Sequence, residues 1–192
     1  MPGIAPSNTQ DAEFVSLSLH PWYLSRENLT QQIAWIEHHI AQPKVVALGE
    51  AGIDKRCKTD LELQTSAFEL MVQLSEKYKL PLIIHAVKSA NEIIGLKKEL
   101  RPQQPWIIHG FRGKTELMNM FISHGIYLSF GTKYNETSFK LAPDNMIFIE
   151  TDDKDAHINE LYAQGALLKE IPVEEFIAKI DRNVKQVFHL PR

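Results

Sequence analysis

The sequence predicts an α/β fold in which short buried strands alternate with amphipathic helices. Near-continuous apolar runs recur along the chain, and stretches with apolar residues at helical spacing lie between them. Parallel strands covered on both faces have such continuous runs, and the alternation is typical of βαβ units. Six runs are predicted strands, at residues 14–19, 45–49, 82–85, 106–109, 126–130 and 146–150.

The predicted helices follow the strands in order, each with an apolar face for the sheet. A last helix begins near Pro172, a residue suited to a first helical turn. Residues 1–13 are rich in loop-forming residues and are expected to be irregular. The apolar positions of the helices are Leu29, Ile33, Ile36 and Ile40; Ala67, Met71, Leu74 and Tyr78; Leu117, Phe121 and Ile122; and Phe176, Ile177, Ile180, Val184, Val187 and Phe188.

Length and composition predict a single globular domain over residues 1–192. The chain has 192 residues, of which 44% are hydrophobic and 23% charged, which excludes disorder and disulfide scaffolds. Its net charge of −3 provides no overall basic field, so any contact with nucleic acid is expected to be local. One cysteine, no signal peptide and no apolar run of about 18 residues predict a cytoplasmic protein without membrane contact.

Residues that can bind a metal follow four of the predicted strands. Glu50, His85, His109 and Asp152 each come at or directly after the end of an apolar run. The carboxyl ends of parallel strands converge on one rim, so these side chains are expected to meet. Imidazole and carboxylate together suit Zn, Mn, Fe or Co and, with added water, Mg. Any one of them alone is equally well explained as a helix cap or a turn residue.

The order and spacing of several motifs resemble those of TatD-type metal-dependent deoxyribonucleases. The likeness covers roughly residues 14–188. It rests on the motifs Leu19-His20-Pro21-Trp22, Gly49-Glu50-Ala51-Gly52-Ile53-Asp54, Leu80-Pro81-Leu82-Ile83-Ile84-His85, His109-Gly110-Phe111-Arg112-Gly113, the run from Gly125 to Gly131, Ile149-Glu150-Thr151-Asp152 and Asn183-Val184-x-x-Val187-Phe188.

The resemblance implies a TIM-barrel-like hydrolase of the amidohydrolase-like superfamily that cuts phosphodiester bonds with two divalent ions. In the family pattern the residue matching Glu50 bridges both ions, those matching His85 and His109 complete one ion, and the residue matching Asp152 holds the other together with a His-x-His pair. No His-x-His occurs in this sequence. The expected ions are Mg or Mn, with Zn as an alternative.

The strand count departs from the complete architecture, because a (β/α)₈ barrel has eight strands and only six are clear here. The fold is therefore expected to be incomplete at its N-terminus. Either Met1 is an internal methionine of a longer gene or the lineage has lost its first strands. A barrel without its first strands has three outcomes open: a smaller barrel, a homo-oligomer covering the open side, or poor folding.

The function expected from the resemblance is divalent-metal-dependent hydrolysis of DNA at single-stranded or frayed ends. The expected catalytic residues are Asp152 and Glu50, with Asp152 taking the proton of the attacking water. Arg112, Lys88 and His20 are the expected substrate contacts, although His20 also has a structural reading. The alternative is a degenerate, non-catalytic relative that binds at most one metal.

Five further residues have two readings each. Asp54 and Asp153 either orient a metal ligand or form a turn or cap. Trp22, Tyr23 and Tyr134 either stack on unpaired bases or pack under a loop. The sequence has no Gly-x-Ser-x-Gly elbow and no glycine-rich phosphate loop, which disfavours acyl transfer and nucleotide-loop chemistry.

Overall fold

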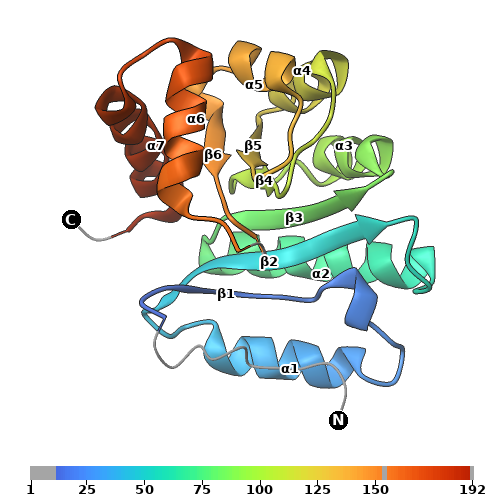
Figure 1. The fold of residues 1–192 in the computed structure, drawn as a ribbon. Helices are drawn as coiled ribbons and strands as arrows, with labels where there is room; N and C mark the ends of the chain where they lie inside the picture. Colours follow the sequence, from blue (N-terminus) through green and yellow to red (C-terminus); the bar gives the residue numbers. More distant parts are fainter. Residues whose placement is uncertain (1–11, 153–154, 191–192) are drawn as a thin grey trace. The chain divides into compact units, whose positions relative to one another are not determined.

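The computed structural model describes residues 12–152 and 155–190. The chain forms two compact units, Met1–Trp106 and Ile107–Arg192, which we call the N-terminal and C-terminal units (Figure 1). No helix in these described ranges is both long and apolar enough to cross a membrane.

The N-terminal unit is built on three parallel strands that neighbour one another in chain order. Strand β1 (Val15–Leu17) pairs with β2 (Val45–Asp54), which pairs with β3 (Leu82–Val87). The connections contain the short 3₁₀ helix η1 (Pro21–Tyr23) and the helices α1 (Leu29–His39), α2 (Leu61–Tyr78) and α3 (Ala90–Leu100). The unit ends at Trp106, the first residue of strand β4 (Trp106–Ile108), and the Leu82 amide donates to the Pro105 carbonyl just before it.

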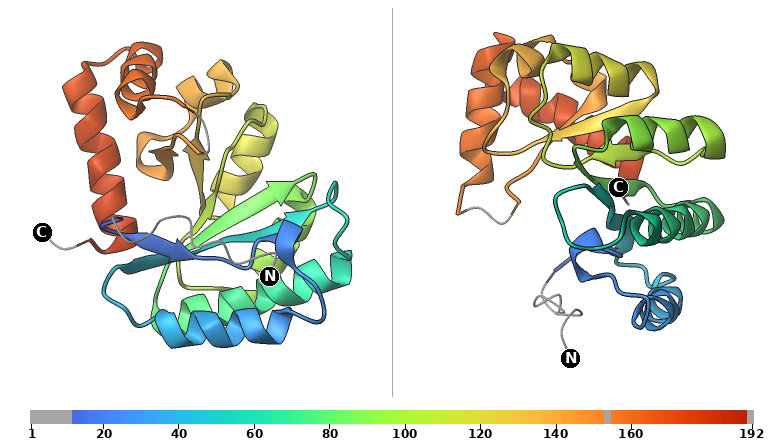
Figure 2. Two further views of the ribbon diagram at one scale, coloured as in Figure 1. Left: turned by 60° about the horizontal axis from the view of Figure 1, so that its bottom comes forward. Right: turned by 90° about the vertical axis from the view of Figure 1, so that its right-hand side faces the viewer.

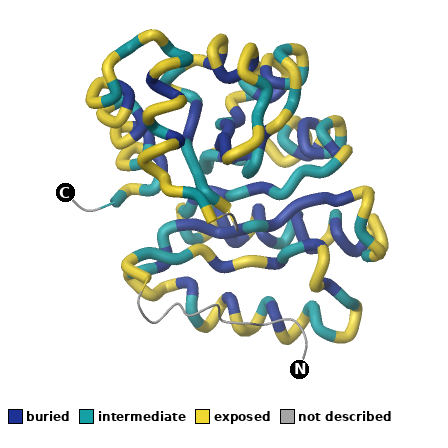
Figure 3. The backbone as a smooth tube through the Cα atoms, in the orientation of Figure 1, coloured by how far each residue is buried: buried dark blue, intermediate teal, exposed yellow. Residues whose placement is uncertain are grey.

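Strand β2 lies at the centre of the N-terminal core. Its residues Leu48 and Ile53 are fully buried, as is Ile84 of β3, and the burial colouring shows β2 as largely buried and β3 as mostly intermediate (Figure 3). Helix α2 covers them with Phe68 and Met71. The helix begins at Asp60, whose side chain accepts the Leu63 amide and so satisfies one of the free donors of the first turn.

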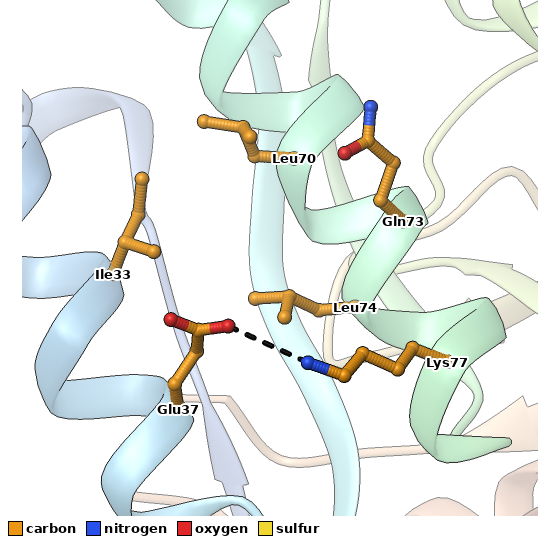
Figure 4. A pocket seen from close by; sticks show the side chains of 6 residues that line it. All are labelled: Ile33, Glu37, Leu70, Gln73, Leu74 and Lys77. Carbon is orange, nitrogen blue, oxygen red and sulfur yellow. Dashed lines mark ion pairs between the residues drawn. The ribbon is translucent and has the colours of Figure 1, made fainter.

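Helices α1 and α2 lie side by side beneath these strands (Figure 2). A shallow groove between them is lined by Ile33, Leu70, Gln73 and Leu74 (Figure 4). Glu37 and Lys77 join the two helices across it with an ion pair of 3.7 Å. None of the predicted site residues lines this groove.

The C-terminal unit contains the parallel pair β5 (Ile126–Phe130) and β6 (Ile147–Ile149). Around them lie α4 (Thr115–Ser123), α5 (Glu136–Leu141), η2 (Asp144–Met146), α6 (Ile158–Lys169) and α7 (Val173–Phe188). Buried aromatic rings fill the core, among them Phe111, Phe130, Phe139 and Phe176. The Asn183 amide of α7 donates to the Ile147 carbonyl and ties the last helix to β6.

The structure confirms the α/β class and all six predicted strands. One strand extends well beyond its predicted end, because β2 continues from Gly49 to Asp54. Of the residues predicted to be irregular, 1–11 lie outside the described ranges, and Ala12 and Glu13 belong to no helix or strand. The single domain over residues 1–192 stays a prediction.

Candidate metal site

A bulge in β2 sets the direction of Glu50. Leu48 pairs with Leu82 and Ala51 with Ile84, so β2 contains one more residue than β3 over this stretch. Such an extra residue locally redirects the bulged strand. Glu50 therefore lies inside β2, and the prediction that it follows the strand's end is wrong. The strand was predicted to end at residue 49, where the apolar run ends, because the small residues that follow also suit a loop.

Beyond the bulge, β2 presents Glu50, Gly52 and Asp54 on one face, since alternate residues of a strand point the same way. Gly52 pairs with His85 of β3. The two carboxylates therefore flank the His85 ring from the neighbouring strand. Gly52 is required there, because a Cβ would lie 2.0 Å from the His85 carbonyl oxygen and the residue has φ +153°.

His85 lies between these two carboxylates. Its Nδ1 is 3.5 Å from Glu50 Oε2, and its Nε2 is 3.2 Å from Asp54 Oδ2. Burial lowers the pKa of His85, but hydrogen bonds and the charges of Glu50 and Asp54 outweigh it and raise the pKa overall. The ring is thus held in one orientation by acidic partners on both sides.

Asp54 is the anchor of this arrangement and is only 3% exposed. Its carboxylate accepts the Trp22 indole N–H at 2.7 Å and the Arg56 amide at 2.7 Å. Burial would raise the pKa of Asp54, yet these hydrogen bonds, together with His85, lower it overall. An ionised Asp54 can only accept, so His85 Nε2 carries a proton and Nδ1 is the nitrogen left for a cation. Asp54 is therefore both a turn residue and the group that orients His85.

His20 completes a group with Glu50 and His85, each offering a ligand atom within 4.8 Å of the others. The proton positions give His20 a different role. As the N-cap of η1, it accepts the Trp22 backbone N–H on Nδ1 at 3.2 Å. The neutral ring then has its proton on Nε2, which is 3.5 Å from Glu50 Oε2. His20 thus presents an N–H donor, whereas the neutral form of His85 presents a lone pair on Nδ1.

The C-terminal unit contains a second imidazole between two carboxylates. His109, directly after β4, has Nδ1 2.9 Å from Glu150 Oε1 and Nε2 3.8 Å from Asp152 Oδ1. The Gly110 amide also donates to Glu150 Oε1 at 2.9 Å. Glu150 therefore orients His109 through Nδ1 and leaves Nε2 facing Asp152. This is the arrangement found for metal-ligating histidines, with one nitrogen for a carboxylate and the other for the cation.

Asp152 follows β6 in a left-handed backbone conformation, with φ +56°. Among residues with a side chain, Asp and Asn adopt this conformation most readily. Asp152 lies two residues after Glu150 in the sequence. The turn brings its carboxylate, like that of Glu150, beside the His109 ring.

Within the N-terminal unit the structure brings together Glu50, His85 and His20, and within the C-terminal unit His109 and Asp152. Lys88 and Arg112 are exposed and form no ion pair with any described residue. Asp153 lies outside the described residues. Tyr134 packs on Phe139, with ring centroids 4.9 Å apart, which supports its packing role.

The sequence reasoning did not find the role of Glu150. The signal was present, because Glu150 lies directly after an apolar run and two residues before Asp152. On β2 the two acids, Glu50 and Asp54, also follow an apolar run and lie four residues apart. On β2 the extended strand puts both acids on one face, whereas after β6 the left-handed turn at Asp152 brings its carboxylate beside His109.

The fold and the two imidazole–carboxylate groups define an α/β protein with candidate metal-binding residues. The model of the TatD related DNase family matches residues 6–189 of the chain. The chain therefore belongs to the TatD-related DNase family, whose members include metal-dependent hydrolases and nucleases.

Two relatives illustrate this family. The uncharacterized metal-dependent hydrolase YabD of Bacillus subtilis is 27% identical over 94% of this chain and 79% of its own length. The 3'-5' ssDNA/RNA exonuclease TatD of Escherichia coli is 29% identical over 70% of this chain and 55% of its own length.

Solved structures confirm the TIM-barrel-like fold class. The TatD homologue YjjV of Escherichia coli matches with a TM-score of 0.79 at 22% identity, over 93% of this chain and 77% of that one. A TatD family hydrolase from Entamoeba histolytica matches with a TM-score of 0.76 at 22% identity, over 91% of this chain and 74% of that one. At this identity the likeness shows the fold alone.

Proposed function

We propose that the chain is a divalent-metal-dependent phosphodiester hydrolase that acts on single-stranded or frayed ends of DNA. The observation that carries the proposal is the repeated carboxylate–imidazole arrangement, Asp54 with His85 and Glu150 with His109. In each, the second ring nitrogen faces a further carboxylate, Glu50 or Asp152. Charged, oriented groups of this kind are costly to maintain for stability alone.

The proposed metal ligands are Glu50, His85, His109 and Asp152. Their nitrogen and oxygen donors fit Mn and Zn, and Mg with added water. A divalent cation held by such ligands stabilises charge on a phosphoryl oxygen and lowers the pKa of the attacking water. His85 can serve only after it loses the Nδ1 proton that its acidic neighbours favour, so protons compete with the cation for this site.

We assign proton transfer and phosphate binding to side chains of this chain. Asp152, partly exposed after β6, accepts the proton of the attacking water. The exposed Lys88 and Arg112 follow β3 and β4 and hold phosphate oxygens, the guanidinium in bidentate fashion. His20 donates its Nε2–H, which orients the catalytic Glu50 carboxylate and is available to a phosphate oxygen.

The substrate class is supported by the relatives and by charge. The relative from Escherichia coli is a 3'-5' ssDNA/RNA exonuclease, and one from Schizosaccharomyces pombe is a deoxyribonuclease. With a net charge of −3 the chain has no general attraction for duplex DNA, which favours short contacts at strand ends. The cytoplasmic location and the homo-oligomer stay predictions.

A non-catalytic relative that binds at most one metal is the second candidate. The observation that favours it is the sequence itself, since the 192 residues contain no His-x-His. In this second candidate, the remaining ligands bind a cation too weakly for hydrolysis, or the bound cation provides too little positive charge to stabilise the phosphoryl oxygen.

The deciding experiment is cleavage of end-labelled single-stranded DNA by the 192-residue chain with Mg or Mn, beside an EDTA control. Asp152→Ala is the test variant. Asp181→Ala, which removes an exposed carboxylate paired with Lys185 on α7, is the matched control. We expect metal-dependent cleavage that Asp152→Ala abolishes and Asp181→Ala leaves intact. Absence of cleavage in a preparation shown to be folded by circular dichroism supports the non-catalytic candidate.

A further inference from the structure

The short helix η1 carries two large aromatic side chains that the core does not use. Trp22 is 57% exposed and Tyr23 is 55% exposed. Exposed aromatic neighbours are unusual in a chain that buries rings as large as Trp106 and Phe68 completely. Two neighbouring exposed rings provide a flat apolar surface that is accessible to a ligand.

Several hydrogen bonds fix the backbone of η1, although the Trp22 and Tyr23 side chains are exposed to solvent. The Tyr23 carbonyl accepts from Asn28 Nδ2 at 2.9 Å and from Gln32 Nε2 at 3.2 Å. The Pro21 carbonyl accepts from Thr59 Oγ1 at 2.7 Å. Asn28 lies at the start of α1, Gln32 lies within it and Thr59 lies before α2, so these groups fix the backbone from which both rings project, and the Trp22 indole is held further by its N–H to Asp54. Such preorganisation reduces the entropy lost on binding.

The two rings lie directly beside the candidate metal ligands. The His20 ring centroid is 4.9 Å from that of Trp22 and 5.6 Å from that of Tyr23. The Trp22 ring is 5.7 Å from His85, and its N–H is bonded to Asp54. A flat group on this surface would therefore lie within one nucleotide's length of Glu50 and His85.

We propose that Trp22 and Tyr23 form a stacking site for one unpaired nucleobase of the strand end, adjacent to the phosphate to be cut. This inference rests on the proposed function, and it assigns to Trp22 and Tyr23 the preference for unpaired strand ends. An unpaired base has a free π-face, and stacking of one base on an aromatic side chain stabilises complexes of single-stranded nucleic acid. A base within a duplex is covered on both faces by its neighbours. The site thus selects unpaired ends without reading sequence.

The test measures binding of a fluorescent oligo-dT to the 192-residue chain by anisotropy, in EDTA so that no cleavage occurs. Trp22→Ala and Tyr23→Ala should each weaken binding about tenfold, in the range known for base stacking. Trp22→Phe should retain most of the affinity, because it keeps an aromatic face and loses only the N–H to Asp54. Trp35→Ala is the matched control, since Trp35 is 38% exposed and stacks on His39 within α1.

A second strand with abasic sites at its end separates stacking from other effects of the variants. The wild-type chain should lose about tenfold in affinity for this strand, and Trp22→Ala should bind both strands equally. The inference is overturned if wild type binds both strands alike, if Trp22→Phe is as weak as Trp22→Ala, or if duplex DNA with blunt ends binds as well as oligo-dT.

The outcomes also separate this inference from the proposed function. Binding that depends on the base and on Trp22, with no cleavage in any metal, supports the stacking site and overturns hydrolysis. Metal-dependent cleavage with binding indifferent to Trp22 and Tyr23 supports hydrolysis and overturns the stacking site.

Discussion

The carboxylates behind the histidines are the residues on which the proposed site depends most. Asp54 and Glu150 bond His85 and His109 through different ring nitrogens, Nε2 in the first and Nδ1 in the second. Each leaves the other nitrogen for a cation. The orientation of both proposed ligands is thus set by Asp54 and Glu150, which need not touch a cation.

Replacing Asp54 by Asn should lower the affinity for Mn²⁺ by about 10- to 100-fold, the effect typical of removing the partner of a metal-binding histidine. The single Asn oxygen can still accept the Arg56 amide, while the NH2 group takes the place of the oxygen that accepts from Trp22 and His85, so circular dichroism is used to show that the variant is folded. Titration followed by electron paramagnetic resonance measures the free ion, with Asp181→Asn as control. Equal affinities for wild type and Asp54→Asn would contradict the role of Asp54.

Gly52 is the position where backbone geometry restricts substitution most. Gly52→Ala should destabilise the chain by about 2 kcal/mol or more, because the new Cβ meets the His85 carbonyl at 2.0 Å. Urea unfolding measures the change. Gly95→Ala is the control: it lies in α3 with nothing within 4 Å of its Cβ, and it should stabilise by about 0.5 to 1 kcal/mol. A neutral Gly52→Ala would mean that β2 and β3 can separate here.

Candidate ligands could be proposed from the sequence where polar side chains follow an apolar run. His85, His109 and Asp152 were proposed in this way, and their role as metal ligands stays a prediction. The pairing of each histidine with Asp54 or Glu150 could not be proposed, because it depends on strand register and on which ring nitrogen each acid reaches. Sequence spacing limits which residues share a face but does not determine the proton positions.

Among the elements, β2 shows the limit of prediction most clearly. Its first half is an apolar run, and its second half, from Glu50 to Asp54, contains glycine and acidic residues that favour turns. Pairing with β3 keeps the second half extended, which is a tertiary effect. The helices α3, α5 and α6 were likewise not assigned, since none has a long apolar stripe of its own.

Helices α6 and α7 are joined to η2 through one carboxylate. Asp144 lies 3.0 Å from Lys169 and 2.8 Å from Lys179, and the Lys169 side chain is only 7% exposed. Asp144→Asn leaves that lysine buried without its counter-charge, so we expect a loss of about 1 to 2 kcal/mol in the free energy of unfolding at pH 7. Asp181→Asn, in an exposed pair, should cost less than about 0.5 kcal/mol.

The same pair predicts a pH dependence. Burial would raise the pKa of Asp144, but Lys179 and Lys169 lower it overall. A carboxyl whose pKa is lower in the folded state stabilises the fold above its unfolded pKa of about 4, and this contribution is lost as pH falls through the folded value. The gap between wild type and Asp144→Asn in urea unfolding should therefore shrink below pH 4. A gap that is constant with pH would contradict the ion pair.

At the scale of the whole molecule, the acidic balance determines how DNA binding depends on salt. If Lys88 and Arg112 are the phosphate contacts, the logarithm of the affinity for single-stranded DNA should fall with the logarithm of salt at a slope of about −1.4. Arg112→Ala should reduce the slope by about 0.7. A slope of −4 or steeper would indicate a broad basic surface and contradict local contact.

The architecture was the most predictable level. Alternation of apolar runs and amphipathic stretches is repeated along the chain, so an error in one element does not change the class. Division into Met1–Trp106 and Ile107–Arg192 was not foreseeable, because β4 continues the same pattern across the boundary.

The opposite use of the two histidine nitrogens has a consequence for engineering the site. An asparagine amide oxygen is as many bonds from the backbone as Nδ1, and a glutamine amide oxygen as many as Nε2. His85, which offers Nδ1, is therefore best imitated by Asn, and His109, which offers Nε2, by Gln. Redesign of the two imidazole–carboxylate groups therefore requires a different substitution for each histidine.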